Sequence, residues 1–335
     1  MRRSYRIGAA LTALVLLALP TAAVACAPPD PIRDLDLPRY YRDAAKSVVD
    51  PAKLAENKAA TKALRDYVRA VVAAADQAQL DPSEAQRVAG AGCALRHLDR
   101  WASGEALLGK MKTRQAEYER KWTVAALALA YLKVRTRAPR DLDSRIADWL
   151  GALSDRAYRN AAKPGRARNN HWYWVGLGEA AVALIDGNET RWSRAGAIFD
   201  DAMAETNEQG LLPQEVARAR RGLVYHEFAL MPLVAMVVLA DAKGEDWRTR
   251  SDDRLRSLTL RTARGLRKPE TFPSGWKQDA SGPRGGWAGL ATHVFRRDRE
   301  VIRAVRRLKA KPAHRLLGGD ASALLKALRL AGADG

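Results

Sequence analysis

Apolar residues recur at helical spacing along most of this chain. Within Lys58–Gln77, for example, Leu64, Val68 and Val71 fall on one stripe. No stretch shows the sustained alternation of β-branched residues that is typical of strands. The sequence therefore predicts an all-α protein. Besides Lys58–Gln77, the expected helices are Ala116–Val134, Leu142–Tyr158, Trp172–Ile185, Arg191–Glu205, Glu215–Ala240, Asp253–Leu266, Glu300–Leu308 and Ala321–Leu330.

Short connectors separate most of these helices. Asp186-Gly187-Asn188 and Gly210–Pro213 are two of them, and short connectors favour antiparallel neighbours that pack in pairs. Two stretches are less regular: Ala27–Pro38 is expected to wrap the surface, and Thr271–Gly289 is expected to form a long loop. The sequence shows no clear domain boundary within residues 26–335, so this range is predicted to form a single domain of stacked helical hairpins.

The composition indicates a polyanionic partner. The chain has 335 residues, of which 47% are hydrophobic, so it is too rich in core-forming residues to be disordered. Its 57 Lys and Arg exceed its 38 Asp and Glu, which gives a formal net charge of +19. A charge of this size favours nucleic acid, an anionic membrane surface or an acidic polysaccharide as partner.

The first 25 residues resemble an export signal. Arg2, Arg3 and Arg6 precede an apolar run, and Ala23-Val24-Ala25 gives the small-x-small pattern that signal peptidase cleaves after. Removal of residues 1–25 takes three positive charges from +19 and leaves +16. We therefore expect a strongly basic mature protein that is periplasmic or secreted, with no stable membrane insertion once the signal is cleaved.

Cleavage at this point would leave Cys26 as the first residue, and Cys93 is the only other cysteine. Two cysteines in an exported protein suggest one disulfide. Two alternatives stay open: Cys26 could carry a lipid, although Ala23 stands where a lipobox usually has Leu, and Cys93 could be a free buried thiol.

Motifs of several large enzyme classes are absent from the sequence. It contains no HExxH, no CxxC pair, no EF-hand loop, no GxxxxGK[ST] loop and no GxSxG elbow. Metal hydrolases, nucleotide-dependent enzymes and serine hydrolases are therefore unsupported. We expect no cofactor and no metal site.

The segment Asn169–Trp174 concentrates chemically capable side chains. It reads Asn-Asn-His-Trp-Tyr-Trp, with two amides, an imidazole and three aromatic rings at the predicted start of a helix. Asn is also a good N-cap, and aromatic residues are common in cores. A capped helix with a buried aromatic face therefore explains the same residues as well as a catalytic site does.

The segment Gln214–Glu227 is the second concentration. Arg218, Arg221 and Tyr225 are spaced to share one helix face, while Arg220 lies off that face. A basic surface stripe is the ordinary interpretation, but the apolar run that follows, Phe228–Leu239, favours a helix that enters the core and lines a cleft with its first turns. An Arg beside Tyr225 is expected to lower the pKa of the phenol, which would suit proton transfer near neutral pH.

The two segments together resemble the alginate lyases of polysaccharide lyase family 5. NNHWYW and LLPQEVARARRGLVYHEFAL are similar to the family's NNHxYW and RxxRxxxYHxxAL patterns. CAPP, the GCALRHLDRWASGEALLG stretch, Arg120-Lys121-Trp122 and RLLGG at Arg315–Gly319 agree as well. Trp287–Phe295 departs from the family pattern, which could alter the uronate accepted.

The resemblance implies a fold and a set of residue roles. The fold is an incomplete α/α toroid around a deep cleft. Asn170, His171, Arg218 and Tyr225 match the family's catalytic residues, and Cys26 and Cys93 match cysteines that the family pairs. Further candidates for substrate binding are Arg120, Lys121, Trp122, Trp172, Trp174, Arg221 and Arg315. For the three tryptophans, core packing is the competing interpretation.

The implied reaction is β-elimination of a 4-linked polyuronate. Arg218 and Asn170 would neutralise the sugar carboxylate as negative charge develops, so no metal is required. For mannuronate or glucuronate, Tyr225 could take the C5 proton and return it to the C4 oxygen, or His171 could act as a separate base. For α-guluronate, His171 as the base and Tyr225 as the acid would be needed. Polymannuronate is the first expected substrate. Polyglucuronate and hyaluronan are alternatives.

Three rival functions fit the sequence less well. A nucleic-acid binder rests on charge alone and has no recognition motif to support it. A non-catalytic polyuronate-binding protein would keep Arg218 and lose Tyr225 or His171, yet both are present. A toroid lyase for sulfated glycosaminoglycans fits the NNHxYW pattern less well. We therefore expect an enzyme that acts as a monomer, with an anionic polysaccharide as its partner.

Overall fold

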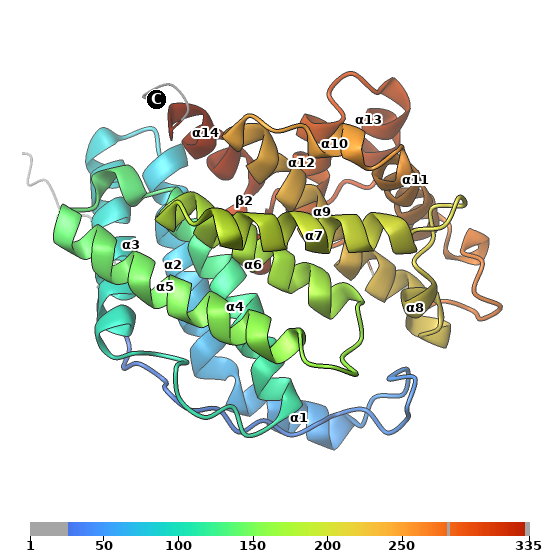
Figure 1. The fold of residues 1–335 in the computed structure, drawn as a ribbon, viewed down its shortest axis with the longest axis horizontal. Coiled ribbons are helices and arrows are strands. Elements are labelled where there is room, and N and C mark those ends of the chain that lie inside the picture. The colour runs from blue at the N-terminus through green and yellow to red at the C-terminus, as the bar shows by residue number, and fades with distance from the viewer. Residues whose placement is uncertain (1–25, 280–281, 332–335) are drawn as a thin grey trace, which may run out of the picture.

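The protein is built almost entirely of helices (Figure 1). A computed structural model describes residues 26–279 and 282–331, and the predicted signal peptide, residues 1–25, lies outside them. The helices are α1 (Pro51–Ala60), α2 (Lys62–Leu80), α3 (Glu84–Ser103), α4 (Arg114–Leu132), α5 (Arg140–Ala161), α6 (Asn170–Asp186), α7 (Glu189–Glu205), α8 (Pro213–Val216), α9 (Gly222–Lys243), α10 (Trp247–Arg250), α11 (Arg254–Arg267), α12 (Trp287–Val294), α13 (Arg299–Arg306) and α14 (Ala321–Ala331). The strands are β1 (Ala313–His314) and β2 (Gly319–Asp320), which pair with each other.

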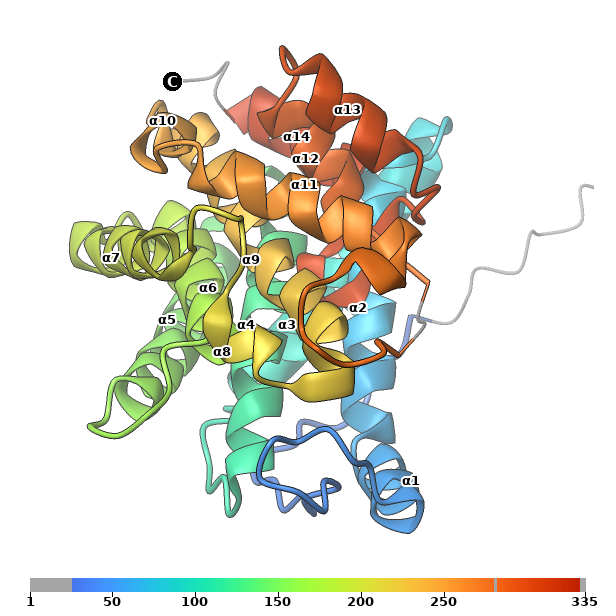
Figure 2. The same cartoon turned by 90° about the vertical axis from the view of Figure 1, so that its right-hand side faces the viewer.

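The helices form hairpins arranged around a common core. The inner helices α2, α4, α6 and α9 pack against one another in this order, and each has an outer partner, which is α3, α5, α7 or α11. The last helix, α14, packs against α2, α4, α9 and α12, so the C-terminal part of the chain fills the space between the first and last hairpins (Figure 2). This is the all-α architecture that the apolar spacing predicts, and it is the incomplete α/α toroid that the family resemblance implies.

The centre of the molecule is dominated by two apolar helices. In α6 and α9 most residues are buried, because each helix is surrounded by neighbouring helices and needs no polar face. Ala219–Lys243 is the stretch among the described residues that is long and apolar enough to cross a membrane, but 89% of its apolar 18-residue window is buried inside the protein. Helix α9, which makes up most of this stretch, is therefore a core helix of the toroid.

Two sequence expectations are wrong in detail. The expected loop Thr271–Gly289 is shorter, because α12 begins at Trp287 inside it. The expected helix Glu215–Ala240 is interrupted: α8 ends at Val216, a 3₁₀ turn covers Ala219–Arg221, and α9 begins at Gly222. Ala219 has a φ of +51°, which is the left-handed backbone that breaks the helix.

The disulfide between Cys26 and Cys93 is confirmed. It joins the first described residue to α3 across 67 residues of sequence. Downstream of it, the extended chain is held by backbone hydrogen bonds from Leu107 N to the carbonyl of Ile32 and from Leu35 N to that of Lys110. These contacts fix the segment that leads to Tyr40 and Tyr41.

Candidate active site

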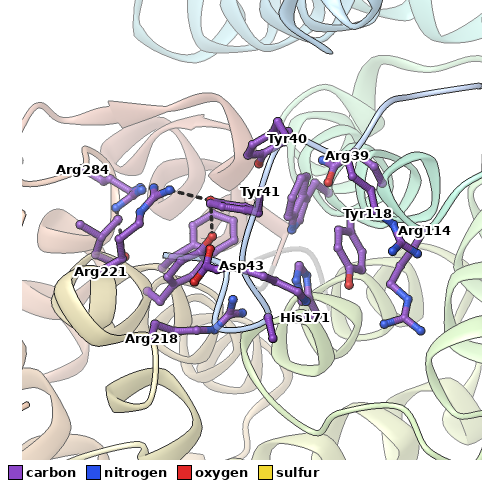
Figure 3. Close-up of a pocket in the computed structure, with 17 residues that line it drawn as sticks. Arg39, Tyr40, Tyr41, Asp43, Arg114, Tyr118, His171, Arg218, Arg221 and Arg284 are labelled. Carbon is purple, nitrogen blue, oxygen red and sulfur yellow. Dashed lines mark hydrogen bonds between the residues drawn. The ribbon is translucent and has the colours of Figure 1, made fainter. Parts of the chain in front are cut away.

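A cavity of about 330 Å³ opens between the segment 39–46, α4, the start of α6 and the α8–α9 junction (Figure 3). We call it the catalytic cavity. Six of its lining side chains are Arg or Lys and one is Asp, so an anion is favoured inside it. Its lining residues are Arg39, Tyr40, Tyr41, Asp43, Ala44, Lys46, Arg114, Gln115, Tyr118, Trp122, His171, Arg218, Arg221, Val224, Tyr225, Phe228 and Arg284.

The break before α9 positions two guanidinium groups over one phenol ring. The Cζ atom of Arg218 lies 4.2 Å from the centroid of the Tyr225 ring, and that of Arg221 lies 5.3 Å from it. Gly222 allows the close turn, because a Cβ there would lie 3.2 Å from the carbonyl oxygen of Val216. The three residues thus converge as expected, although a 3₁₀ turn rather than one continuous helix brings them together.

The hydroxyl of Tyr225 is part of a hydrogen-bonded chain. It lies 2.6 Å from the hydroxyl of Tyr41, which also accepts a hydrogen bond of 2.6 Å from Nη1 of Arg221. Burial, with Tyr41 beside it, raises the pKa of Tyr225 above its ordinary value of 10. Arg221 and Arg218 act in the opposite direction and do not prevail. The expected lowering of this pKa is therefore wrong, and the phenol is protonated at neutral pH.

His171 faces the same cavity from the first turn of α6. The side chain of Asn169 caps this helix by accepting a hydrogen bond of 3.1 Å from the backbone N–H of His171. The imidazole stacks on the Tyr118 ring, with centroids 3.7 Å apart. Burial, followed by the charge of Lys121, holds the pKa of His171 well below 6.5. The imidazole is therefore neutral at neutral pH, and its buried Nδ1 has no hydrogen-bond partner among the described residues.

Asn170 lies behind the cavity wall instead of lining it. Its backbone N–H and its Nδ2 both donate to Oε1 of Glu215, each at 2.8 Å. Glu215 Oε2 in turn lies 3.8 Å from Nε of Arg218. Burial raises the pKa of the Glu215 carboxyl. The charge of Arg218 is the largest effect that lowers this pKa, and burial outweighs it. Asn170 and Arg218 are thus joined through a buried carboxylate that the sequence analysis did not single out.

The three tryptophan candidates separate into two groups. Trp122 lines the catalytic cavity, where it packs edge-on against Phe228. Trp172 and Trp174 are core residues: their indole N–H groups donate to Asp201 and to the carbonyl of Phe228. The core-packing interpretation therefore fits the position of these two.

Of the four basic candidates for substrate binding, Arg221 lines the catalytic cavity and the other three do not. Lys121 is buried one layer behind it, with its Nζ 4.3 Å from the centroid of the Tyr118 ring. Arg120 is buried and pairs with Glu117 at 2.5 Å. Arg315 is half-buried, lies outside the lining and sits near the charge of Glu119. Both Arg120 and Arg315 therefore lie outside the lining of the catalytic cavity.

Several residues that line the catalytic cavity were not among the site residues predicted from the sequence. Arg39, Tyr40, Tyr41 and Lys46 come from the segment between the expected surface stretch and the first expected helix, and their only signal is an aromatic pair among basic residues. Three more lining residues come from helix or loop positions that carry no motif: Arg114, Tyr118 and Arg284.

The described residues offer little to a metal ion. The cluster with metal-ligating spacing among them is Cys26, Cys93 and His97, and its two sulfurs are joined to each other. In the catalytic cavity, the one carboxylate, Asp43, accepts hydrogen bonds from Ser47 and Val48. The donor set of the cavity suits an anion instead.

Comparison with known proteins gives a consistent result. A family model described as alginate lyase matches residues 34–272. A polysaccharide lyase of Stenotrophomonas maltophilia is 38% identical over 263 residues, which cover 77% of this chain and 78% of that protein. An alginate lyase of Pseudomonas aeruginosa is 30% identical over 187 residues, which are 54% of this chain and 51% of that protein.

Solved structures show the same fold. Alginate lyase A1-III from Sphingomonas species A1 superposes with a TM-score of 0.74 at 21% identity, over 90% of this chain and 86% of that chain. A histidine-to-alanine variant of alginate lyase A1-III, complexed with a tetrasaccharide, superposes with a TM-score of 0.77 at 21% identity, over 92% of this chain and 88% of that chain.

Proposed function

The chain belongs to the alginate lyase family of polysaccharide lyases, and on this premise we propose that it cleaves 4-linked polyuronates, polymannuronate first, by β-elimination without a metal ion. One observation carries the proposal: Arg218, His171 and Tyr225 line one strongly cationic cavity. A neutral imidazole and a protonated phenol beside a guanidinium are the groups that such an elimination needs.

The first obstacle to this reaction is the weak acidity of the C5–H bond beside a carboxylate. Loss of that proton builds a second negative charge, so the carboxylate must be neutralised. Arg218 supplies a buried positive charge, and Glu215 with Asn170 holds it in place. A preorganised donor of this kind lowers the barrier by about 3–4 kcal/mol.

The proton transfers follow from the resting protonation states. Neutral His171 accepts the C5 proton, the C5 electron pair forms the C4=C5 double bond, and the C4–O bond breaks. Tyr225 donates its proton to the leaving oxygen. In β-mannuronate and β-glucuronate the C5 hydrogen and the C4 oxygen lie on the same side of the ring, and the two sugars differ only at C2. We therefore propose that both are accepted.

The deciding experiment offers the purified protein polymannuronate, polyguluronate, polyglucuronate and hyaluronan, and follows the ultraviolet absorbance of the unsaturated product with EDTA present. Turnover of polymannuronate in EDTA is the expected result. Tyr225→Phe should lower kcat by about 10²–10⁴-fold while polymer binding persists, because only the proton donor is lost. Tyr158→Phe, a half-buried tyrosine that packs on Trp172 outside the cavity, is the matched control.

Binding without turnover of any of the four polymers would favour a non-catalytic polyuronate-binding protein. Loss of turnover in EDTA would overturn the metal-free mechanism.

We also propose export to the periplasm or the medium, supported by the disulfide, because such bonds persist in oxidising compartments. Action as a monomer is part of the same proposal.

A further inference from the structure

Most of the positive charge of the chain is concentrated near its C-terminal end. Residues 254–311 contain 16 Lys and Arg against four Asp and Glu, which gives +12 of the total +19. Helix α11 alone carries five Arg and no acidic residue. The catalytic cavity takes only Arg284 from this region, so the cavity does not account for the concentration.

Helices α11 and α13 lie side by side and run in the same direction. Near their starts, Arg256 donates to Asp298 at 2.6 Å and to Glu300 at 2.7 Å. Toward their ends, the two helices enclose a cavity of about 160 Å³, here called the arginine groove. It is lined by Leu260, Ala263, Arg264, Arg267, Glu300, Arg303, Ala304 and Arg307.

The arginine groove combines an apolar floor with a cationic rim. Leu260, Ala263 and Ala304 are buried or half-buried, whereas its four arginines, Arg264, Arg267, Arg303 and Arg307, are exposed. Within the described part of the chain none of the four arginines forms an ion pair. The one acidic lining residue, Glu300, is paired with Arg256 instead. Four like charges around one small cavity repel each other, so an anion placed among them is stabilised.

We propose that the arginine groove is a second binding site for a carboxylated polysaccharide, which holds a stretch of the polymer outside the catalytic cavity. Guanidinium groups bind carboxylates in bidentate fashion, and an apolar floor suits the C–H face of a pyranose. Asp279, which follows α11 in the chain, accepts a hydrogen bond of 2.7 Å from Arg220, the neighbour of the cavity residue Arg221. This inference rests on the proposed function for the identity of the polymer.

The test compares two double variants of the full-length mature protein. Arg264→Gln/Arg303→Gln removes two charges from the groove. Arg96→Gln/Arg140→Gln removes two exposed charges on α3 and α5, and α3 lies at the other end of the molecule from α11 and α13 (Figure 1). We expect the groove variant to raise KM for long polymannuronate roughly tenfold, with kcat and the KM for a mannuronate tetrasaccharide unchanged. The control variant should stay near the wild-type values.

Equal effects in both double variants, or no effect in either, would overturn the inference. A groove variant that keeps its affinity for polymannuronate but loses affinity for duplex DNA would overturn it in favour of a nucleic-acid site.

Polymer binding is also measured by calorimetry in a Tyr225→Phe background at low and high NaCl. This arm separates the two proposals: an inactive wild type refutes the lyase function, whereas polymer binding that depends on Arg264 and Arg303 still supports the groove.

Discussion

Tyr225 and His171 have their pKa values displaced in opposite directions by the same cause, which is burial. Burial disfavours the charged form of each group, so the phenol keeps its proton and the imidazole stays without one. The pair is therefore set for acid and base roles before substrate arrives. A phenolate at Tyr225 would need to overcome both burial and the neighbouring hydroxyl of Tyr41.

These directions predict a broad pH plateau. The base must be deprotonated, so kcat/KM decreases on the acid side only below pH 6.5, which is the ordinary pKa of histidine. The acid must be protonated, so kcat/KM decreases on the alkaline side only above pH 10, which is the ordinary pKa of tyrosine. We expect kcat/KM for polymannuronate to change little between pH 7 and pH 9. A tenfold rise per pH unit across that range would show that the phenolate of Tyr225 is the base.

Glu215 is predicted to position Asn170 and Arg218 without touching the substrate. Glu215→Ala removes the shared acceptor and should lower kcat/KM by about 10²-fold, since an oriented donor to the transition state is lost. Glu215→Gln keeps an oxygen for the two Asn170 donors and should recover part of the loss. Steady-state kinetics on polymannuronate check this. If the alanine and glutamine variants lose equal activity with unchanged folding, the carboxylate charge matters rather than the hydrogen bonds.

At the scale of elements, the disulfide anchors the extended segment that leads to the cavity residues Tyr40 and Tyr41. Cys26→Ser/Cys93→Ser is expected to reduce the free energy of unfolding by about 2–4 kcal/mol, because the unfolded chain gains freedom over a long loop. Activity at 25 °C should hold within about twofold, since backbone hydrogen bonds at Ile32 and Leu35 still fix the segment. Denaturant unfolding and kinetics measure both effects.

A reductant supplies the control for this prediction. It should destabilise the wild type by the same amount and leave the serine variant unchanged. If the variant lost activity at 25 °C while it stayed folded, the disulfide would be needed to place Tyr41, and the backbone hydrogen bonds would be insufficient.

The helical elements were predictable because apolar spacing is a local signal. The break before α9 was not, since it depends on the left-handed backbone of Ala219, which is a residue type that rarely adopts it. The catalytic residues were predicted from the resemblance of two contiguous motifs to a known family, because composition alone explained Asn169–Trp174 equally well as a capped helix. Tyr41 and Glu215 were missed because their importance arises only from contacts with Tyr225 and Asn170, which are 184 and 45 residues away in sequence.

At the scale of the whole molecule, the C-terminal segment closes the toroid through one buried cation. The Nζ of Lys133, at the end of α4, donates to Asp76 of α2 and, at 2.6 Å, to the carbonyl of Gly318. Gly318 and Gly319 have positive φ values, and a Cβ on Gly319 would lie 2.2 Å from the Asp76 carboxylate. This contact therefore explains the two glycines of RLLGG, whereas Arg315 of the same segment lies outside the catalytic cavity.

Lys133→Met should therefore reduce the free energy of unfolding by about 3–5 kcal/mol, because it leaves the half-buried Asp76 carboxylate without its cation and the Gly318 carbonyl without its donor next to a fully buried position. Lys62→Met removes an exposed lysine that pairs with Asp66 and should change stability by less than about 1 kcal/mol. Denaturant unfolding compares the two, and hydrogen exchange should show α14 losing protection first in Lys133→Met. If α14 stayed as protected as in the wild type, apolar packing of this helix on α2, α4 and α9 would be what closes the molecule.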